Sequence, residues 1–169
     1  GRPRLFFAVS PGAMDSMVNR YTANRRMRHD DAYTPDGRHG MRPDYPSIVY
    51  SKILKQLFPD VPVVLGGIEA SLRRLTHYDY WEDKLKKCIL CESGADIILY
   101  GMGEKNTLQL CRELENGRSI KDVKDIPQTV YLAKKEDIPG GITDTDIVLH
   151  SHEECLRNKK AQAENFRHI

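Results

Sequence analysis

Three runs of consecutive apolar residues mark the chain, at Leu5–Val9, at Val63–Leu65 and within Ala95–Tyr100. They do not alternate with polar residues, which is typical of parallel strands that helices cover on both faces. Helical spacing of apolar residues occurs in two further segments, Ser47–Leu57 and Glu104–Leu114. The pattern therefore predicts an α/β fold, with a Rossmann-like or flavodoxin-like parallel sheet and flanking helices.

The remaining segments have weaker patterns. Asp15–Tyr21 predicts a short helix. Glu82–Leu90 fits either a strand or a helix, and the long crossover around it leaves room for an inserted hairpin. Thr129–Ala133 alternates enough for an edge strand or a hairpin. The charged stretch Glu153–Arg167 predicts a helix that packs on another part of the protein.

Glycines follow the second and third apolar runs directly. Because the carboxyl ends of parallel strands meet at one edge of the sheet, where open α/β sheets bind ligands, we expect a ligand edge there. The spacing matches neither G-x-G-x-x-G nor a P-loop. A glutamate after each glycine pair could face a ligand or cap the next helix, and capping is the favoured interpretation. The predicted cofactor-binding residues are Gly66, Gly67, Glu69, Gly101, Gly103 and Glu104.

The segment Asn24–Tyr45 has almost no apolar periodicity and predicts a long loop, which is usually functional or disordered. Between Asn19 and Arg42, a stretch called the arginine loop below, there are six arginines and no lysine. Guanidinium groups could hold a phosphate or a carboxylate, and a solvated loop is an equally weighted alternative. The predicted anion-binding residues are Arg20, Arg25, Arg28 and Arg38.

Composition changes this picture little. The 169 residues include 26 basic and 24 acidic side chains, for a formal charge of +2, so bulk charge indicates neither nucleic acid nor a membrane surface. No apolar run approaches the roughly 18 residues that a membrane helix needs. These features predict a cytoplasmic protein.

The candidate metal ligands are sparse. Cys88 and Cys91 form a C-x2-C pair, but a tetrahedral site needs a second pair, and the other two cysteines are isolated. We therefore expect structural thiols and no metal site. His150 and His152 are expected to be solvated loop residues.

The chain begins at Gly1 without an initiator methionine, which predicts that the first strands of the sheet lie upstream. In the flavodoxin-like order 2-1-3-4-5, Leu5–Val9 would be the third strand and would lack its neighbour. Such an open edge is expected to self-associate or to bind the chain's own tail.

Three stretches resemble a known family: Met14–Ala23, Arg28–Pro35 and Ser71–Trp81. They are similar to the YgiQ-like radical SAM proteins, and the similarity covers nearly the whole chain. The two strand–glycine units also look like the second half of the cobalamin-binding-type domain that precedes the catalytic barrel in many radical SAM enzymes.

The resemblance implies a cobalamin-binding-type domain over residues 1–149, missing its first strands, and a helical linker over residues 150–169 toward a radical SAM barrel outside this chain. It also implies a [4Fe-4S] cluster and S-adenosylmethionine in the full-length enzyme. The chain departs from the family's cluster motif, C-x3-C-x2-C, because Lys84 stands where the first cysteine would be. It also lacks the D-x-H-x-x-G stretch that would supply a histidine ligand to cobalamin.

Neither cofactor is therefore expected in this segment, which would not be catalytic by itself. Its predicted role is to shape one side of the active-site cleft of a radical SAM enzyme of unknown substrate. The alternative is a non-catalytic module that binds an anionic ligand or RNA through the arginine loop.

Overall fold

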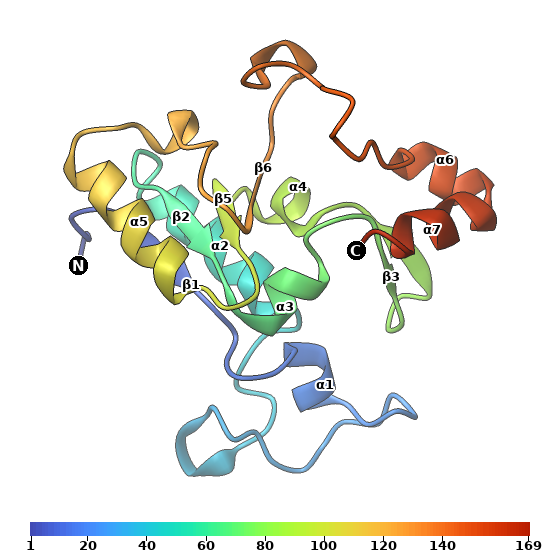
Figure 1. Ribbon diagram of the computed structural model, residues 1–169. Helices are drawn as coiled ribbons and strands as arrows, with labels where there is room; N and C mark the ends of the chain where they lie inside the picture. The colour runs from blue at the N-terminus through green and yellow to red at the C-terminus, as the bar shows by residue number, and fades with distance from the viewer.

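The computed structural model describes residues 1–169, and its centre is a four-stranded sheet in the order β1-β2-β5-β6 (Figure 1). Strands β1 (Phe7–Val9), β2 (Val63–Leu65) and β5 (Ile97–Leu99) are parallel. Strand β6 (Thr129–Tyr131) pairs antiparallel with β5. The predicted α/β fold, a Rossmann-like sheet with flanking helices, is confirmed, and so is the predicted edge strand.

The register brings the carboxyl ends of the parallel strands to one edge. Val9 pairs with Leu65, and Leu65 pairs with Ile98. The backbone N–H of Gly66 donates to the carbonyl of Val9 at 3.0 Å, so the ladder continues to the first glycine. The glycines after β2 and β5 therefore start side by side, as the pattern of apolar runs predicts.

The two faces of the sheet are covered unequally. Helices α2 (Pro46–Leu57) and α4 (Ile89–Ser93) cover one face, which carries Val9 and Leu65. Helix α5 (Glu104–Glu115) covers the other face through its fully buried Leu110. Burying one such side chain contributes about 1.5–3 kcal/mol. The helices predicted around residues 47–57 and 104–114 are thus confirmed.

Two segments extend from this core near the carboxyl edge of the parallel strands. The first contains α1 (Ser16–Arg20), the arginine loop and a 3₁₀ turn at Pro35–Gly37, and it lies below the sheet in Figure 1. The second follows α3 (Gly67–Leu72) and is the antiparallel hairpin of β3 (His77–Asp79) and β4 (Lys84–Lys86). The predicted short helix, long loop and inserted hairpin are present. The ambiguous segment 82–90 belongs first to β4 and then to α4.

After β5 and α5 the chain makes two more 3₁₀ turns, at Ile120–Asp122 and Lys135–Asp137, on either side of β6. The C-terminal segment then forms α6 (His152–Arg157) and α7 (Lys159–Phe166). The sequence pattern predicts a single helix over Glu153–Arg167, whereas the structure has two.

The C-terminal segment divides at Asn158, which has extended backbone and caps α7 by accepting a hydrogen bond from the N–H of Lys160 at 3.0 Å. It packs next to the hairpin, where Lys87 and Glu153 form an ion pair at 3.0 Å. The predicted role of this tail, a linker toward a barrel outside this chain, stays a prediction. None of the helices is long and apolar enough to cross a bilayer.

Candidate functional site

A cavity of about 230 Å³ opens at the carboxyl edge of the parallel strands. Its floor is the ends of β1, β2 and β5, and its rim is the glycine turns that the sequence singled out. All four predicted glycines contribute to it. The lining residues are Phe6, Ala8, Val9, Ser10, Val64, Leu65, Gly66, Gly67, Leu99, Gly101, Gly103 and Thr107.

The glycines fall into two classes. Gly67 and Gly101 have φ of +80° and +72°, which side chains rarely adopt, and a Cβ on Gly67 would lie 2.6 Å from Ser10 Oγ. Gly66 has extended backbone, with φ of −148°, and Gly103 has φ of −82°. A Cβ at either of these two positions would meet nothing closer than 3.8 Å. Backbone geometry therefore requires glycine at Gly67 and Gly101. At Gly66 and Gly103 the missing side chain keeps the cavity open.

The chemistry of the cavity is nearly neutral. Apart from the glycines, its walls are apolar side chains and the hydroxyls of Ser10 and Thr107, and no charged side chain lines it. A cavity of this kind fits an uncharged, partly apolar group with one or two hydrogen-bonding atoms. It does not fit a phosphate that would need cationic side chains.

The two glutamates predicted beside the glycines do not line this cavity. Glu69 is completely buried and its Oε2 accepts a hydrogen bond from the backbone N–H of Ser16 at 2.8 Å. Glu104 is exposed in the first turn of α5. Both glutamates lie in the first turn of their helix, where a carboxylate favours the helix dipole, but neither helix has a side-chain capping hydrogen bond. Glu69 instead holds the start of α1, a long-range contact that local sequence does not reveal.

Beside Glu69 lies a buried ion pair between Asp15 and Arg73. Asp15 also caps α1, accepting hydrogen bonds from the N–H groups of Met17 and Val18 at 3.0 and 3.2 Å. Glu69 lies 4.0 Å from the Arg73 guanidinium. Burial alone would lower the pKa of Arg73, but Asp15 and the neighbouring carboxylates raise it, so the cation is firmly held.

Several buried polar atoms in this cluster have no protein partner: Ser16 Oγ, Glu69 Oε1 and Arg73 Nε. Sequence reasoning missed the ion pair between Asp15 and Arg73. The available signals were that Asp15 stands where an N-cap is expected and that Arg73 lies four residues after Glu69.

The same guanidinium lies near the half-buried ring of Tyr45. The Arg73 Cζ lies 5.6 Å from the Tyr45 ring centroid, and Lys86 Nζ lies 4.6 Å from it. The Tyr45 hydroxyl donates to Asp79 Oδ1 at 3.0 Å, and that oxygen also caps the hairpin turn at Trp81 and Glu82. Burial, and then Asp79, raise the pKa of Tyr45, so the phenol stays protonated. These contacts join the hairpin to α2 and α3.

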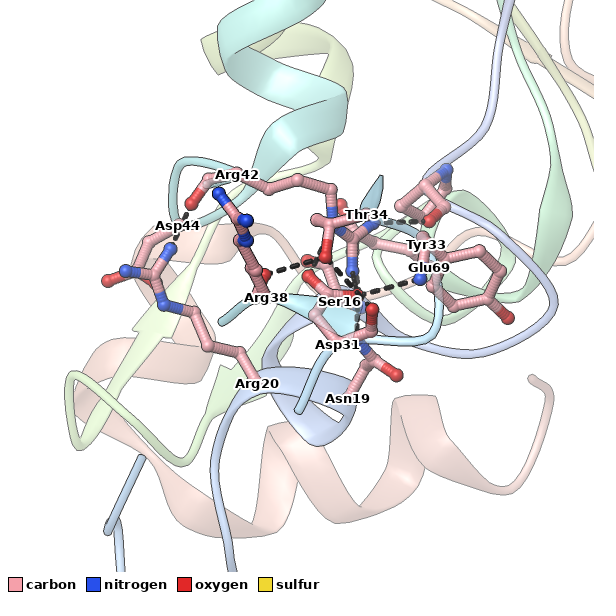
Figure 2. A network of polar contacts seen from close by, with 11 residues as sticks. Ser16, Asn19, Arg20, Asp31, Tyr33, Thr34, Arg38, Arg42, Asp44 and Glu69 are labelled. Carbon is pink, nitrogen blue, oxygen red and sulfur yellow. Dashed lines mark hydrogen bonds and ion pairs between the residues drawn. The ribbon is translucent and has the colours of Figure 1, made fainter. Parts of the chain in front are cut away.

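The arginine loop is organised around Asp31 (Figure 2). Arg42 donates two hydrogen bonds to this carboxylate, at 2.8 and 3.0 Å, and a third to the carbonyl of Pro11 at 2.8 Å. Asn19 donates to it at 2.9 Å. Burial would raise the pKa of Asp31, but the hydrogen bonds from Arg42, from the Tyr33 N–H and from Asn19 together lower it. The loop is therefore a closed structure attached to the end of β1.

A second attachment lies at the ring of Tyr33, whose hydroxyl accepts from the N–H of Ala13 at 2.8 Å. Gly12 has φ of +125°, and a Cβ there would lie 2.5 Å from that ring. Tyr33 thus packs directly on the backbone that follows β1.

The four arginines predicted to bind an anion already have protein contacts. The side chain of Arg20 contacts the carbonyl of Arg42 and Asp44. Arg25 donates to the carbonyl of Tyr80 at 2.6 Å, and Arg28 donates to that of Val18 at 3.2 Å. Arg38 is exposed and 3.4 Å from Asp36. Anion binding by this loop stays a prediction.

The cysteines are dispersed. Cys88 precedes α4 and is half-buried, which raises the pKa of its thiol, while Cys91 is exposed. Cys111 lies on α5 and Cys155 is buried in α6 against Asn165 Nδ2 at 3.3 Å. No three Cys, His, Asp or Glu side chains converge on a point that could hold a metal ion. This donor set does not fit the three thiolates of a radical SAM cluster.

The two histidines of the C-terminal segment also have protein partners. His150 Nε2 lies 2.7 Å from Glu164 Oε2, and His152 Nδ1 lies 3.2 Å from the hydroxyl of Thr76. Both contacts tie α6 and α7 to their surroundings.

Comparisons with known proteins agree on one family. The family model described as Radical SAM N-terminal matches residues 1–169. A UPF0313 protein of Porphyromonas gingivalis is 62% identical over all of this chain, which covers 26% of that protein. A UPF0313 protein of Bacteroides thetaiotaomicron is 59% identical, again over the whole chain and 29% of the relative.

The UPF0313 protein YgiQ of Escherichia coli is 50% identical over 83% of this chain and 19% of its own length. No solved structure is significantly similar. The chain thus spans less than a third of each of these curated relatives.

Proposed function

Because this chain belongs to the Radical SAM N-terminal family, we propose that it forms one wall of the active-site cleft of a radical SAM enzyme. In this proposal the glycine edge faces the cleft and receives part of the substrate or of a cofactor. The predicted residues that form this surface are Gly66, Gly67, Gly101 and Gly103. Glu69 lies outside the cavity and holds the start of α1 through the backbone of Ser16.

One observation carries the proposal: the four glycines predicted from the sequence line a single cavity at the carboxyl edge of the parallel strands. This edge is where open α/β sheets bind ligands. The buried pairs Asp15–Arg73 and Asp31–Arg42 fix the neighbouring loop beside it. A fixed wall with an open, neutral cavity suits the positioning of a substrate or cofactor better than it suits acid–base chemistry.

The cofactors of the proposed enzyme are a [4Fe-4S] cluster and S-adenosylmethionine. Since the cysteines of this chain do not fit the cluster, we place both groups on other parts of the longer protein and assign them no residue here. The resemblance to cobalamin-binding-type domains is carried by the fold, and no histidine of this chain is assigned to cobalamin. The proposed location of the whole protein is the cytoplasm.

The test is to fill the cavity without straining the backbone. Gly66→Val is suited to this, because the extended backbone of Gly66 accepts a branched side chain and its nearest neighbour would be the Leu99 carbonyl at 3.8 Å. Ala133→Val adds a branched side chain at an exposed position outside the cavity and is the matched control. Both variants are made in the protein extended to the length of its relatives.

We expect Gly66→Val to lower S-adenosylmethionine consumption at least tenfold while the thermal unfolding midpoint stays close to that of the parent. The control is expected to keep both values. Unchanged consumption by Gly66→Val would refute the proposed role of the glycine edge.

The alternative, a non-catalytic module that binds an anionic ligand or RNA through the arginine loop, rests on its arginine content. The protein contacts that already engage Arg20, Arg25 and Arg28 favour the first proposal.

A further inference from the structure

Cys88 and Cys91 are the two cysteines of this chain that share one turn. The carbonyl of Cys88 accepts a hydrogen bond from the N–H of Cys91 at 2.9 Å, which closes a four-residue turn. The first and last Cα atoms of such a turn lie within about 7 Å of each other. A disulfide needs Cα atoms about 4.4–6.8 Å apart, so little backbone movement is needed to bring the two sulfurs to bonding distance.

The positions of these two residues in α4 favour a contact between their side chains. Cys88 is the N-cap residue, and Cys91 is the third residue of the helix. In a capping box, the side chains at these two positions each reach back to the backbone of the other. Helix α4 has no side-chain capping hydrogen bond, so no other group of the turn engages the thiols in this way. The pair therefore has the local geometry of a C-x2-C dithiol, a motif that exchanges with disulfides.

The two thiols differ in their access to solvent. Cys91 is exposed, whereas Cys88 is half-buried and packs against the apolar cluster beneath α2 and α4. Burial raises the pKa of the Cys88 thiol. A reagent in solvent therefore reacts first with Cys91, and Cys88 is placed to act as the second nucleophile.

Helix α2 supplies a cation beside the exposed thiol. Cys91 lines an open surface depression together with Lys52, Lys55 and Glu92. Lys55 and Glu92 are each in an ion pair with another residue, at 2.6 and 3.2 Å. Lys52 is exposed and has no ion-pair partner. It is therefore available to attract a negatively charged reagent to Cys91.

We propose that Cys88 and Cys91 form a reversible disulfide by exchange with a small anionic disulfide of the oxidised-glutathione class. The Cys91 thiolate attacks one sulfur of this disulfide, its S–S bond breaks, and the first small thiol leaves as a thiolate. The Cys88 thiolate then attacks the Cys91 sulfur, and the second small thiol leaves in the same way. Two protein thiols are oxidised, one disulfide is reduced to two thiols, and the two protons of the cysteines pass to the leaving thiolates.

The second step is intramolecular. Because one turn holds both sulfurs, the attack by Cys88 is favoured over the attack by another small thiol from solution. The new bond closes a loop within the first turn of α4, so the packing of α4 on α2 is kept. The pair is thus a site of thiol–disulfide exchange, and this assignment is independent of the proposed enzymatic role.

The test uses the protein extended to the length of its relatives. The reduced protein is incubated with oxidised glutathione, the remaining thiols are alkylated, and tryptic peptides are mapped by mass spectrometry. Both cysteines fall on one tryptic peptide, Cys88–Lys105, because no lysine or arginine lies between its ends. An internal disulfide removes two hydrogen atoms from this peptide, whereas a mixed disulfide adds a glutathione. Cys111, a half-buried thiol on α5, is the internal control.

We expect the disulfide between Cys88 and Cys91 to form at least tenfold faster than an adduct at Cys111, and a dithiol reductant to reverse it. Cys88→Ser should stop the reaction at the mixed disulfide on Cys91. Lys52→Gln should slow the reaction with oxidised glutathione by about threefold and leave the reaction with the neutral hydroxyethyl disulfide unchanged.

A mixed disulfide on Cys91 that does not close in the parent protein would overturn the proposal, because the two sulfurs would then not meet. So would equal rates at Cys91 and Cys111, since the pair would then be structural, or a cross-link between two chains, since the bond would then be intermolecular. An unchanged rate for Lys52→Gln with oxidised glutathione would overturn the assignment of an anionic disulfide.

Discussion

Replacing Arg42 by methionine should release the arginine loop without unfolding the sheet. Arg42 and Asp31 have side-chain exposures of 13% and 7%, and the guanidinium makes three hydrogen bonds of 2.8–3.0 Å. Arg42→Met keeps an unbranched side chain of apolar character but removes the guanidinium, and this leaves a buried carboxylate and the Pro11 carbonyl without that donor. We therefore expect the loss of the loop's attachment to the end of β1.

The magnitude follows from removing one partner of a buried pair, which typically costs about 3–5 kcal/mol. A cost of about 3 kcal/mol corresponds to more than a hundredfold change in an opening equilibrium, since about 1.4 kcal/mol is tenfold. The arginine loop lies outside the apolar clusters of the sheet. Most of this cost should therefore appear as local opening.

Amide hydrogen exchange separates local from global effects. The N–H of Asp31 donates to Gly37 and that of Thr34 donates to Asp31, and both should exchange about a hundredfold faster in Arg42→Met. The Ile98 amide in β5 should keep its parent rate. Arg38→Met is the matched control in the same loop, because that side chain is exposed and its ion pair contributes at most about 1 kcal/mol. Unchanged exchange at Asp31 and Thr34, or equal acceleration at Ile98, would refute the reasoning.

The same contact gives the loop a pH dependence. Because the folded protein lowers the pKa of Asp31, the stabilisation is fully present above the unfolded-state value of about 3.9. It is lost as the pH falls through the lower folded-state pKa. Apart from the intrinsic pH dependence of exchange, amide exchange in the loop should therefore accelerate only below about pH 4. The Asp31→Asn variant should lack this acceleration at low pH.

Three further outcomes are expected. His77 is half-buried, and burial lowers its pKa, so its contribution to stability is present above about pH 6.5 and decreases as the pH falls through the folded-state pKa. An NMR titration of the ring that shows a raised pKa would contradict this. Tyr45→Phe removes the donor to Asp79 and should cost about 1.5–3 kcal/mol in denaturant unfolding, whereas Tyr50→Phe, at a more exposed ring, should cost almost nothing. Equal costs would argue against a special role for the Tyr45 hydroxyl. If the arginine loop binds anions, millimolar phosphate should shift the NMR signals of Arg28 and its neighbours, more weakly at high salt, and unchanged signals would exclude the site.

The sequence by itself determined the framework of this fold. The continuous apolar runs at Val63–Leu65 and within Ala95–Tyr100 predicted strands that are covered on both faces, and all residues of β2 and β5 are buried. The run at Leu5–Val9 also forms a strand, but β1 lies at the edge of the sheet and Ala8 is exposed. The glycine pairs that follow the strands placed the edge of the cavity correctly, because parallel strands bring all their carboxyl ends together. These features are local, since each depends on a pattern within about ten residues.

The polar network was decided only by tertiary structure. Asp15 and Arg73 are separated by 58 positions, Ser16 and Glu69 by 53, and nothing in either local pattern states that they meet. Glu69 illustrates the reason: its position after two glycines suits a helix cap, but the crossover geometry turns it toward α1 and buries it. Charged side chains take the partner that the fold brings within hydrogen-bonding distance, and in this protein chain topology, not sequence proximity, sets that distance.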